Sequence, residues 1–156
     1  MATLNSYTLS ADCKTLSLVY ATAPTIADLL TNEISGVTIY ATIAGTIVGN
    51  TWDITSDDIS LSGVMTVLQD LGGSNVPQEY LIGTCELDCC VASLLQSSID
   101  CACKCSKCDD DLRKAQKIHL LSESAKYSVI NENITDAINK YKSAKSFCDE
   151  TCGCGC

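Results

Sequence analysis

The residues best able to do chemistry in this sequence are its cysteines. The chain has 156 residues, with 12 cysteines and a single histidine. Cys13 stands alone near the N-terminus, and the other eleven lie from Cys85 onward. Thiolates bind metal ions, form disulfides or act as nucleophiles. The spacing of the cysteines therefore has to decide among these three chemistries.

Eight cysteines form two dense groups in the last third of the chain. The first group carries C-x-C and C-x-x-C spacings, and in the second, glycines separate the final thiols. The eight residues are Cys101, Cys103, Cys105, Cys108, Cys148, Cys152, Cys154 and Cys156. Four thiolates in a tetrahedral arrangement are a common shell for structural zinc, so eight fill two shells. The pattern predicts two structural zinc ions, without indicating which thiol binds which ion.

A disulfide framework is the competing interpretation of the same cysteines. The first ten residues lack the basic start and apolar run of a signal peptide, which favours a reducing compartment and free thiols. An iron–sulfur cluster is a more distant alternative. A metallothionein-like metal store is another, although such chains lack the apolar cores that this composition predicts.

The remaining cysteines are expected to be structural. Cys85, Cys89 and Cys90 lie roughly 16 Å along a predicted helix from Cys101, at about 1.5 Å per residue, which is too far for a shared metal shell. We expect them to be small core residues or a vicinal pair. Cys13 is expected to be a buried or turn thiol.

Catalysis has little support in the sequence. A nucleophilic cysteine needs a nearby base, and His119 falls in the middle of a predicted helix, about three turns from Cys108. The acidic runs 57–58 and 109–111 lack the D-x-D-x-D-G spacing of calcium loops. The sequence therefore predicts a protein that is not an enzyme.

Composition changes near residue 85, which indicates two domains. Residues 1–84 contain eight acidic residues and one basic residue, Lys14. Residues 85–156 contain eleven acidic and nine basic residues, together with almost all of the cysteines. We therefore predict an α+β protein with one domain at 1–84 and a cysteine-rich domain at 85–156.

The first domain is predicted to be a small antiparallel β-sandwich of the immunoglobulin-like kind. Thr, Val, Ile and Tyr are dense there, and turn residues interrupt the runs every 8 to 12 positions. Predicted strands span 6–10, 15–20, 37–43, 48–54, 63–68 and 79–84. The strands at 37–43 and 48–54 are expected to form a hairpin with Trp52 in the core. A short helix is expected at 25–32, behind Pro24.

The second domain changes to a helical period. Apolar stripes predict helices over 86–100, from 109 to 130, and from 134 to 148, with Asn133 as the N-cap of the last one. Short loops make three such helices run up, down and up, which would bring the eight thiols to one pole. Few large apolar residues line these helices, so a metal clamp is expected to hold them together.

Charge and hydropathy exclude two classes of partner. The formal net charge is −9, and the sequence contains no cluster of basic residues able to neutralise a nucleic-acid backbone. No run of about 18 apolar residues occurs that would predict a transmembrane helix. We expect neither a nucleic acid nor a membrane as partner.

Three short motifs carry a resemblance over nearly the full length of the chain. They are Asp12-Cys13-Lys14-Thr15, Asp88-Cys89-Cys90 and the terminal Cys152-Gly-Cys-Gly-Cys156. Their order, with a Thr/Ile-rich segment and a pair of Ala/Lys-rich helices between them, resembles small cysteine-rich structural proteins of tailed bacteriophages. The C-x-C at 101–103 and the plain apolar tract at 22–30 depart from that pattern.

The resemblance implies a virion protein, assembled in the host cytoplasm, that serves as an adaptor or decoration protein of the head, neck or tail. Its expected partners are other virion proteins, contacted by several symmetric copies. Two alternatives remain open at this point. One is an intracellular metal-binding or redox-regulatory module, and the other is a secreted, disulfide-rich binding protein.

Overall fold

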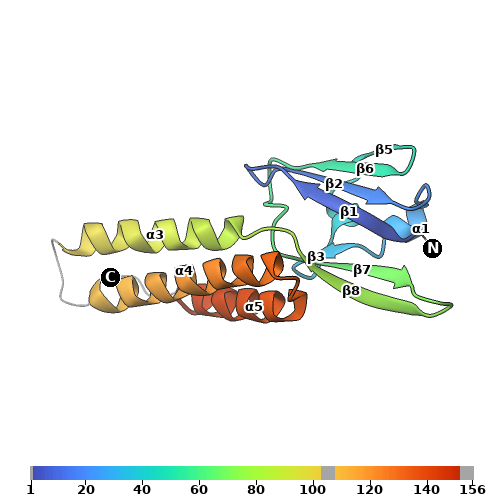
Figure 1. The fold of residues 1–156 in the computed structure, drawn as a ribbon. Helices are drawn as coiled ribbons and strands as arrows, with labels where there is room; N and C mark the ends of the chain where they lie inside the picture. Colours follow the sequence, from blue (N-terminus) through green and yellow to red (C-terminus); the bar gives the residue numbers. More distant parts are fainter. Residues whose placement is uncertain (1, 103–107, 152–156) are drawn as a thin grey trace. The chain divides into compact units, whose positions relative to one another are not determined.

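The structure, a computed structural model, describes residues 2–102 and 108–151. The chain divides into two compact units, Met1–Gly83 and Thr84–Cys156. The first unit carries the two β-sheets and the second carries three long helices (Figure 1). The coarse prediction is confirmed: the protein is mixed α+β, with antiparallel sheets followed by helices.

The strands of the N-terminal unit form two four-stranded antiparallel sheets. The first has the order β1-β2-β6-β5 and the second the order β4-β3-β7-β8. The strands are β1 (Leu4–Leu9), β2 (Thr15–Tyr20), β3 (Glu33–Ile34), β4 (Val37–Thr38), β5 (Thr46–Val48), β6 (Thr51–Thr55), β7 (Val64–Asp70) and β8 (Asn75–Leu81). Two short helices, α1 (Ile26–Leu29) and α2 (Ile39–Thr42), lie between strands along the chain.

Alternating side chains build the core of this unit. On β2, Leu16 and Leu18 are fully buried, and their register partners on β6 are Ile54 and Trp52. Met65 of β7, in the second sheet, belongs to the same buried cluster. The core is therefore shared by both sheets, and Trp52 is a core residue as predicted.

The helix predicted behind Pro24 is present as α1. Thr25 is its N-cap: the Thr25 hydroxyl accepts from the Asp28 amide, and the Asp28 carboxylate accepts from the Thr25 amide. The buried Asp28 carboxylate also accepts from the Ala2 amide at 3.0 Å. This capping box holds α1 at a fixed place beside the start of the chain.

The predicted hairpin over 37–54 is wrong. Val37 and Thr38 pair with β3, and the chain then makes the helical turn α2 before β5 pairs with β6. Alternation over so few residues does not separate a strand from a helical turn, and here Ile39 is the residue that enters the core. The indole Nε1 of Trp52 donates to the Ala44 carbonyl at 2.8 Å, which places the segment between α2 and β5.

The last strand also differs from its prediction. β8 spans Asn75–Leu81 rather than 79–84, and Pro77 lies inside it. The strand tolerates proline because β8 is at the edge of its sheet, where one side of the backbone has no strand to pair with.

Three helices make up the described part of the C-terminal unit: α3 (Cys85–Ala102), α4 (Cys108–Ile130) and α5 (Ile134–Thr151). α4 packs against both other helices. Asn133 Oδ1 accepts from the Asp136 amide, which confirms the predicted cap of α5. Many of the buried side chains are small or medium in size, for example Ala115, Ile118 and Ala137, although Tyr141 is also buried. Among the described residues, the search for a helix long and apolar enough to cross a membrane finds none.

Candidate functional site

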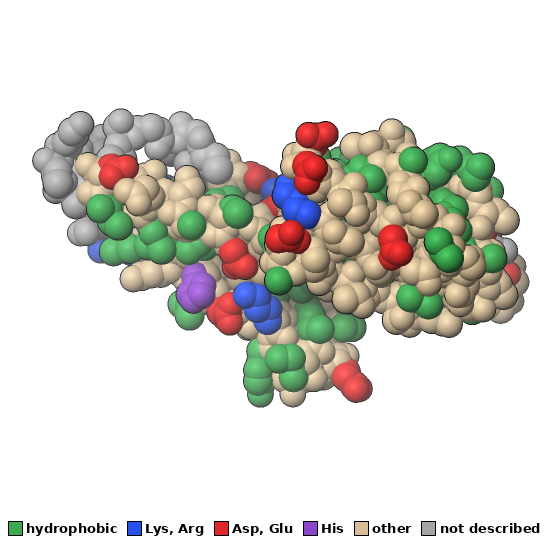
Figure 2. All heavy atoms as spheres, turned by 90° about the horizontal axis from the view of Figure 1, so that it is seen from above, with side chains coloured by type: hydrophobic (Ala, Val, Ile, Leu, Met, Phe, Trp, Pro, Cys, Tyr) green, Lys and Arg blue, Asp and Glu red, His purple; other side chains and the backbone are tan. Residues whose placement is uncertain are grey.

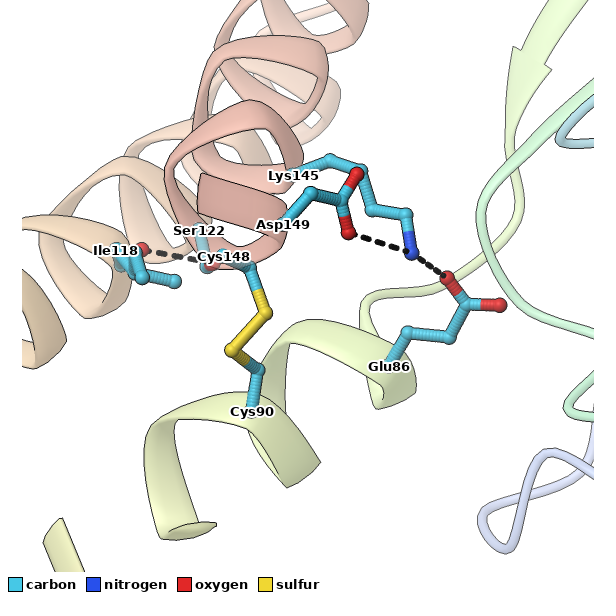
Figure 3. Close-up of a disulfide and its surroundings, with 7 residues drawn as sticks. All are labelled: Glu86, Cys90, Ile118, Ser122, Lys145, Cys148 and Asp149. Carbon is cyan, nitrogen blue, oxygen red and sulfur yellow. Dashed lines mark hydrogen bonds and ion pairs between the residues drawn. A yellow bond between two sulfur atoms is a disulfide. The ribbon is translucent and has the colours of Figure 1, made fainter. Parts of the chain in front are cut away.

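A disulfide joins the first and last helices of the C-terminal unit. Cys90, in the second turn of α3, is bonded to Cys148, in the last turns of α5, with 6.3 Å between their Cα atoms (Figure 3). Both cysteines are buried, with exposed fractions of 9% and 6%. Each one belongs to the apolar stripe of its helix, so the covalent bond runs through the core.

Charged side chains cross the same helix pair beside the disulfide. Lys145 Nζ lies 2.9 Å from Glu86 Oε2 of α3 and 3.7 Å from Asp149 Oδ1 of its own helix (Figure 3). The hydrogen bond with Glu86 raises the pKa of the Lys145 ammonium above its usual value. The ammonium is therefore charged at all pH values near neutrality, and the pair keeps α3 and α5 in one register.

A second set of polar contacts ties α4 to α5 near the loop between them. Asp136 Oδ2 accepts from Ser128 Oγ at 2.7 Å and lies 2.6 Å from Lys140 Nζ. The bonds from Lys140 and Ser128 lower the pKa of the Asp136 carboxyl. Together with the disulfide, these contacts fix the three helices at both ends of α5.

The prediction of zinc is wrong. Among the residues that the structure describes, no group of three or more His, Cys, Asp or Glu side chains is placed to hold a metal ion. Cys148, one of the eight predicted ligands, is committed to the disulfide with Cys90 and presents no thiolate. The predicted metal clamp is replaced, within the described helices, by a covalent bond.

The other seven predicted ligands lie outside the residues whose side chains the structure describes. They are Cys101, Cys103, Cys105, Cys108, Cys152, Cys154 and Cys156.

The cysteines that were expected to be structural show different chemistry from one another. Cys13 and Cys85 are disulfide-bonded, so the expected thiol at Cys13 is buried but oxidised. Cys90 is bonded to Cys148 and not to its neighbour, which excludes a vicinal pair. Cys89 is exposed and is the free cysteine among those described.

The sequence contained a signal for the disulfide that the zinc interpretation obscured. Cys90 lies beside the predicted apolar stripe of α3, and Cys148 continues the stripe of α5. Two cysteines on helix faces that must meet in a core are candidates for a disulfide, whereas a structural zinc shell needs four ligands brought together. Sequence reasoning also missed Glu86 and Lys145, which flank the bond.

A row of exposed apolar side chains follows the outer side of α4. Leu120 and Tyr127 are each 68% exposed and Ile130 is 77% exposed, while the core-facing Ile118 is fully buried. Figure 2 shows hydrophobic side chains beside the single histidine on this part of the surface. Exposed apolar side chains at helical spacing are typical of protein contact surfaces.

The single histidine, His119, is exposed on α4. Its charge helps to lower the pKa of Glu123, after the larger effect of the hydrogen bond from Lys126. The position of His119 on the outer surface of the helix is the one expected for a solvated side chain.

The charged side chains exposed on the N-terminal unit are almost all carboxylates. Six of its eight acidic residues are exposed: Asp12, Asp53, Asp57, Asp58, Asp70 and Glu79. The one basic side chain, Lys14, donates from Nζ to the Asp57 carbonyl at 2.8 Å. The unit therefore carries a surface of one sign, with its only cation bound to its own backbone.

Comparison of the chain with protein-family models, with curated proteins and with solved structures finds no match.

Proposed function

We propose that this chain is a non-enzymatic structural component of a tailed phage particle, an adaptor or decoration protein of the head, neck or tail. The N-terminal unit is proposed to be an immunoglobulin-like β-sandwich that makes the attachment. The sequence motifs around Cys13, Cys89 and the C-terminus supply the resemblance on which the phage assignment rests. The structure adds the distribution of exposed charged side chains, which supports the proposed attachment.

The acidic surface of the N-terminal unit is the observation that carries this proposal. Eight acidic residues against one basic residue make such units repel one another, unless a basic surface lies between them. Electrostatic complementarity then selects the partner and speeds encounter. A basic protein surface, repeated by the symmetry of a particle, would provide these contacts for several copies.

Disulfides are consistent with a protein that becomes part of a released virus particle. They persist on virion surfaces and in other oxidising environments, whereas the cytosol keeps thiols reduced. A chain assembled in the host cytoplasm would form Cys90–Cys148 after the particle leaves the cell. The bond would then stabilise a small helical unit whose side chains bury little apolar area.

The test is made on purified particles of the source phage. Mass spectrometry should find the chain at a constant ratio to a major capsid or tail protein, and cryo-electron microscopy should show its two units at symmetry-related positions. Absence of the chain from particles that are otherwise complete would overturn the proposal.

A charge-reversal variant tests the attachment surface. Particles assembled with Asp57→Lys and Asp58→Lys should carry several-fold fewer copies, because two exposed carboxylates become cations. A matched control, Glu132→Lys with Asp100→Lys in the helical unit, makes the same change of net charge at exposed positions and should be incorporated normally. Equal loss for both variants would show that net charge, and not this surface, matters.

A second candidate is a disulfide-stabilised binding protein that acts outside the cell. Cys90–Cys148 is the observation that favours it, since disulfides are typical of exported domains. Detection of the chain free in the culture medium, and not in sedimented particles, would support this candidate over the first.

A further inference from the structure

A hollow of about 360 Å³ lies between α4 and α5 in the helical unit. Asp110, Arg113, Lys114 and Lys117 line it from α4, and Phe147 and Glu150 line it from α5. Its volume is within the range of small-molecule sites and is about ten times that of a water molecule. The hollow is therefore large enough for an organic ligand.

The hollow concentrates cations in a strongly acidic chain. Three of the ten basic residues line it, against the two acidic residues Asp110 and Glu150, while the whole chain has a net charge of −9. Arg113 is the only arginine in the sequence. With Asp111, which lies 4.0 Å from Lys114, the charges at the hollow balance, so an anion is repelled less here than on the rest of the surface.

The cations of the hollow are only loosely paired with carboxylates of their own helix. Arg113 Nη1 lies 4.0 Å from Asp110 Oδ1, and both side chains are more than 75% exposed. Lys114 Nζ lies 4.0 Å from Asp111 Oδ1. A pair as long and as exposed as Arg113–Asp110 contributes little to stability, so a ligand oxygen would displace it at small cost.

The third cation is positioned by an aromatic ring. Lys117 Nζ lies 3.8 Å from the centroid of the Phe147 ring, so a cation–π contact across the two helices holds the ammonium. The N–H donors of Lys117 that do not face the ring remain available to oxygen atoms. Of the two lining carboxylates, Glu150 already accepts from Ser146 Oγ of its own helix at 3.3 Å.

We propose that this hollow binds a small molecule carrying a phosphate group. A phosphate monoester has a charge of about −1.5 to −2 at pH 7 and three strong acceptor oxygens, which match three cations. The guanidinium of Arg113 presents the fork that binds two of these oxygens, and Lys114 and Lys117 supply point charges. A carboxylate, with one charge and two oxygens, would leave one cation unused.

Two residues of the hollow are unique in the chain, which gives the test two single-site reporters. Phe147 is the only phenylalanine and Arg113 the only arginine. Fluorophenylalanine incorporation yields one ¹⁹F signal, from residue 147, and ¹⁵N-arginine labelling yields one Nε–H signal, from residue 113. Both are followed in the full chain while sodium phosphate, glycerol phosphate or sodium acetate is added at constant ionic strength.

The proposal expects both signals to move in a saturable way with the two phosphate compounds and not with acetate. Tighter binding of glycerol phosphate than of inorganic phosphate would show that the organic part occupies the hollow, and equal binding would identify the phosphate alone as the ligand. The variant Arg113→Gln should weaken binding at least tenfold in the ¹⁹F titration. Lys142→Gln, which removes a cation outside the hollow, should bind as the unmodified chain does.

Two results would overturn the proposal. One is the absence of saturable shifts with either phosphate compound. The other is equal affinity of Arg113→Gln and the unmodified chain, in a variant whose circular dichroism spectrum shows intact helices.

Discussion

Lys145 of α5 and Glu86 of α3 form an ion pair, 2.9 Å long, at the level where the last turns of α5 meet the first turn of α3. Cys90 and Cys148 join the same two helices about one turn further along. The ion pair favours one register of α3 against α5, and the disulfide fixes that register covalently.

Removing the disulfide should destabilise the helical unit. The bond closes a loop between residues 58 apart in the sequence, and a loop of that length restricts the unfolded chain by up to about 4 kcal/mol. The double variant Cys90→Ala with Cys148→Ala should lose about 2 to 4 kcal/mol of unfolding free energy, measured by urea denaturation with circular dichroism at 222 nm.

The exposed Cys89 provides the matched control for that experiment. Cys89→Ala removes a thiol from the neighbouring position without touching the bond, so its unfolding free energy should stay within about 0.5 kcal/mol of the unmodified value. Equal stability of the double variant and this control would contradict the structural role of the bond.

Alkylation without reduction should distinguish the same residues chemically. Iodoacetamide is expected to label Cys89, while peptides containing Cys90 and Cys148 should be recovered as one crosslinked species by mass spectrometry. Labelling of Cys148 in the unreduced chain would argue against the bond.

The ion pair should contribute less than the disulfide and should depend on alkaline pH. Lys145 is about one third exposed, so Lys145→Met should cost no more than about 1 kcal/mol. Because folding raises the pKa of Lys145 above 10.5, its contribution is complete below that pH and is lost as pH rises through the folded-state value. Urea denaturation between pH 8 and 11 should show a steeper loss for the unmodified chain than for Lys145→Met.

Two glycines of the N-terminal unit have the same backbone conformation but different surroundings. Substituting each by alanine therefore distinguishes the cost of backbone strain from the cost of a steric clash. Gly45 and Gly49 have φ of +64° and +62°, and both should lose stability on substitution by alanine. A Cβ at Gly45 would also lie 2.6 Å from the Asp53 carbonyl oxygen, whereas one at Gly49 meets nothing within 4 Å. Gly45→Ala should therefore cost at least about 1 kcal/mol more than Gly49→Ala, measured by the fluorescence of the single tryptophan, Trp52.

Asp28 should make the N-terminal unit sensitive to acid. Burial alone would raise the pKa of this carboxyl, but bonds from Thr25 and Ala2 outweigh it and lower the pKa below 3.8. The stability it contributes is present above pH 3.8 and is lost as pH falls through the folded-state value. The free energy of unfolding, followed by Trp52 fluorescence, should decrease less between pH 5 and 2 in Asp28→Asn than in the unmodified chain. An equal decrease in both would contradict this role of Asp28.

Local patterns in the sequence predicted several elements well. Residues of Thr15–Tyr20 alternate between half-buried and buried over the full strand, and Thr25 and Asn133 cap the helices that follow them. These signals are local, because a capping side chain or an alternating pattern needs only its neighbours. The hairpin predicted over 37–54 was wrong because Trp52 donates to the Ala44 carbonyl and so imposes a turn. That contact joins residues eight positions apart and is not visible in a local pattern.

The cysteines could not be assigned from the sequence because their pairing depends on helix register. Equal helices would place Cys148 beside Cys101, at the far end of α3. α4 is 23 residues long and α3 and α5 are 18, and the observed contacts of Lys145 and Cys148 are with Glu86 and Cys90, near the start of α3. A shift between helices of unequal length changes which side chains meet while leaving every apolar stripe intact.

The bond between Cys90 and Cys148 also decides how the chain responds to mechanical load. Tension applied through the two ends passes directly from α3 to α5 across the sulfur atoms, so residues 91–147 cannot be drawn out. At about 3.5 Å per extended residue, roughly 200 Å of chain is withheld from stretching. Oxidation thus turns the helical unit into a stiff, short connector, while the reduced chain would lengthen under the same force.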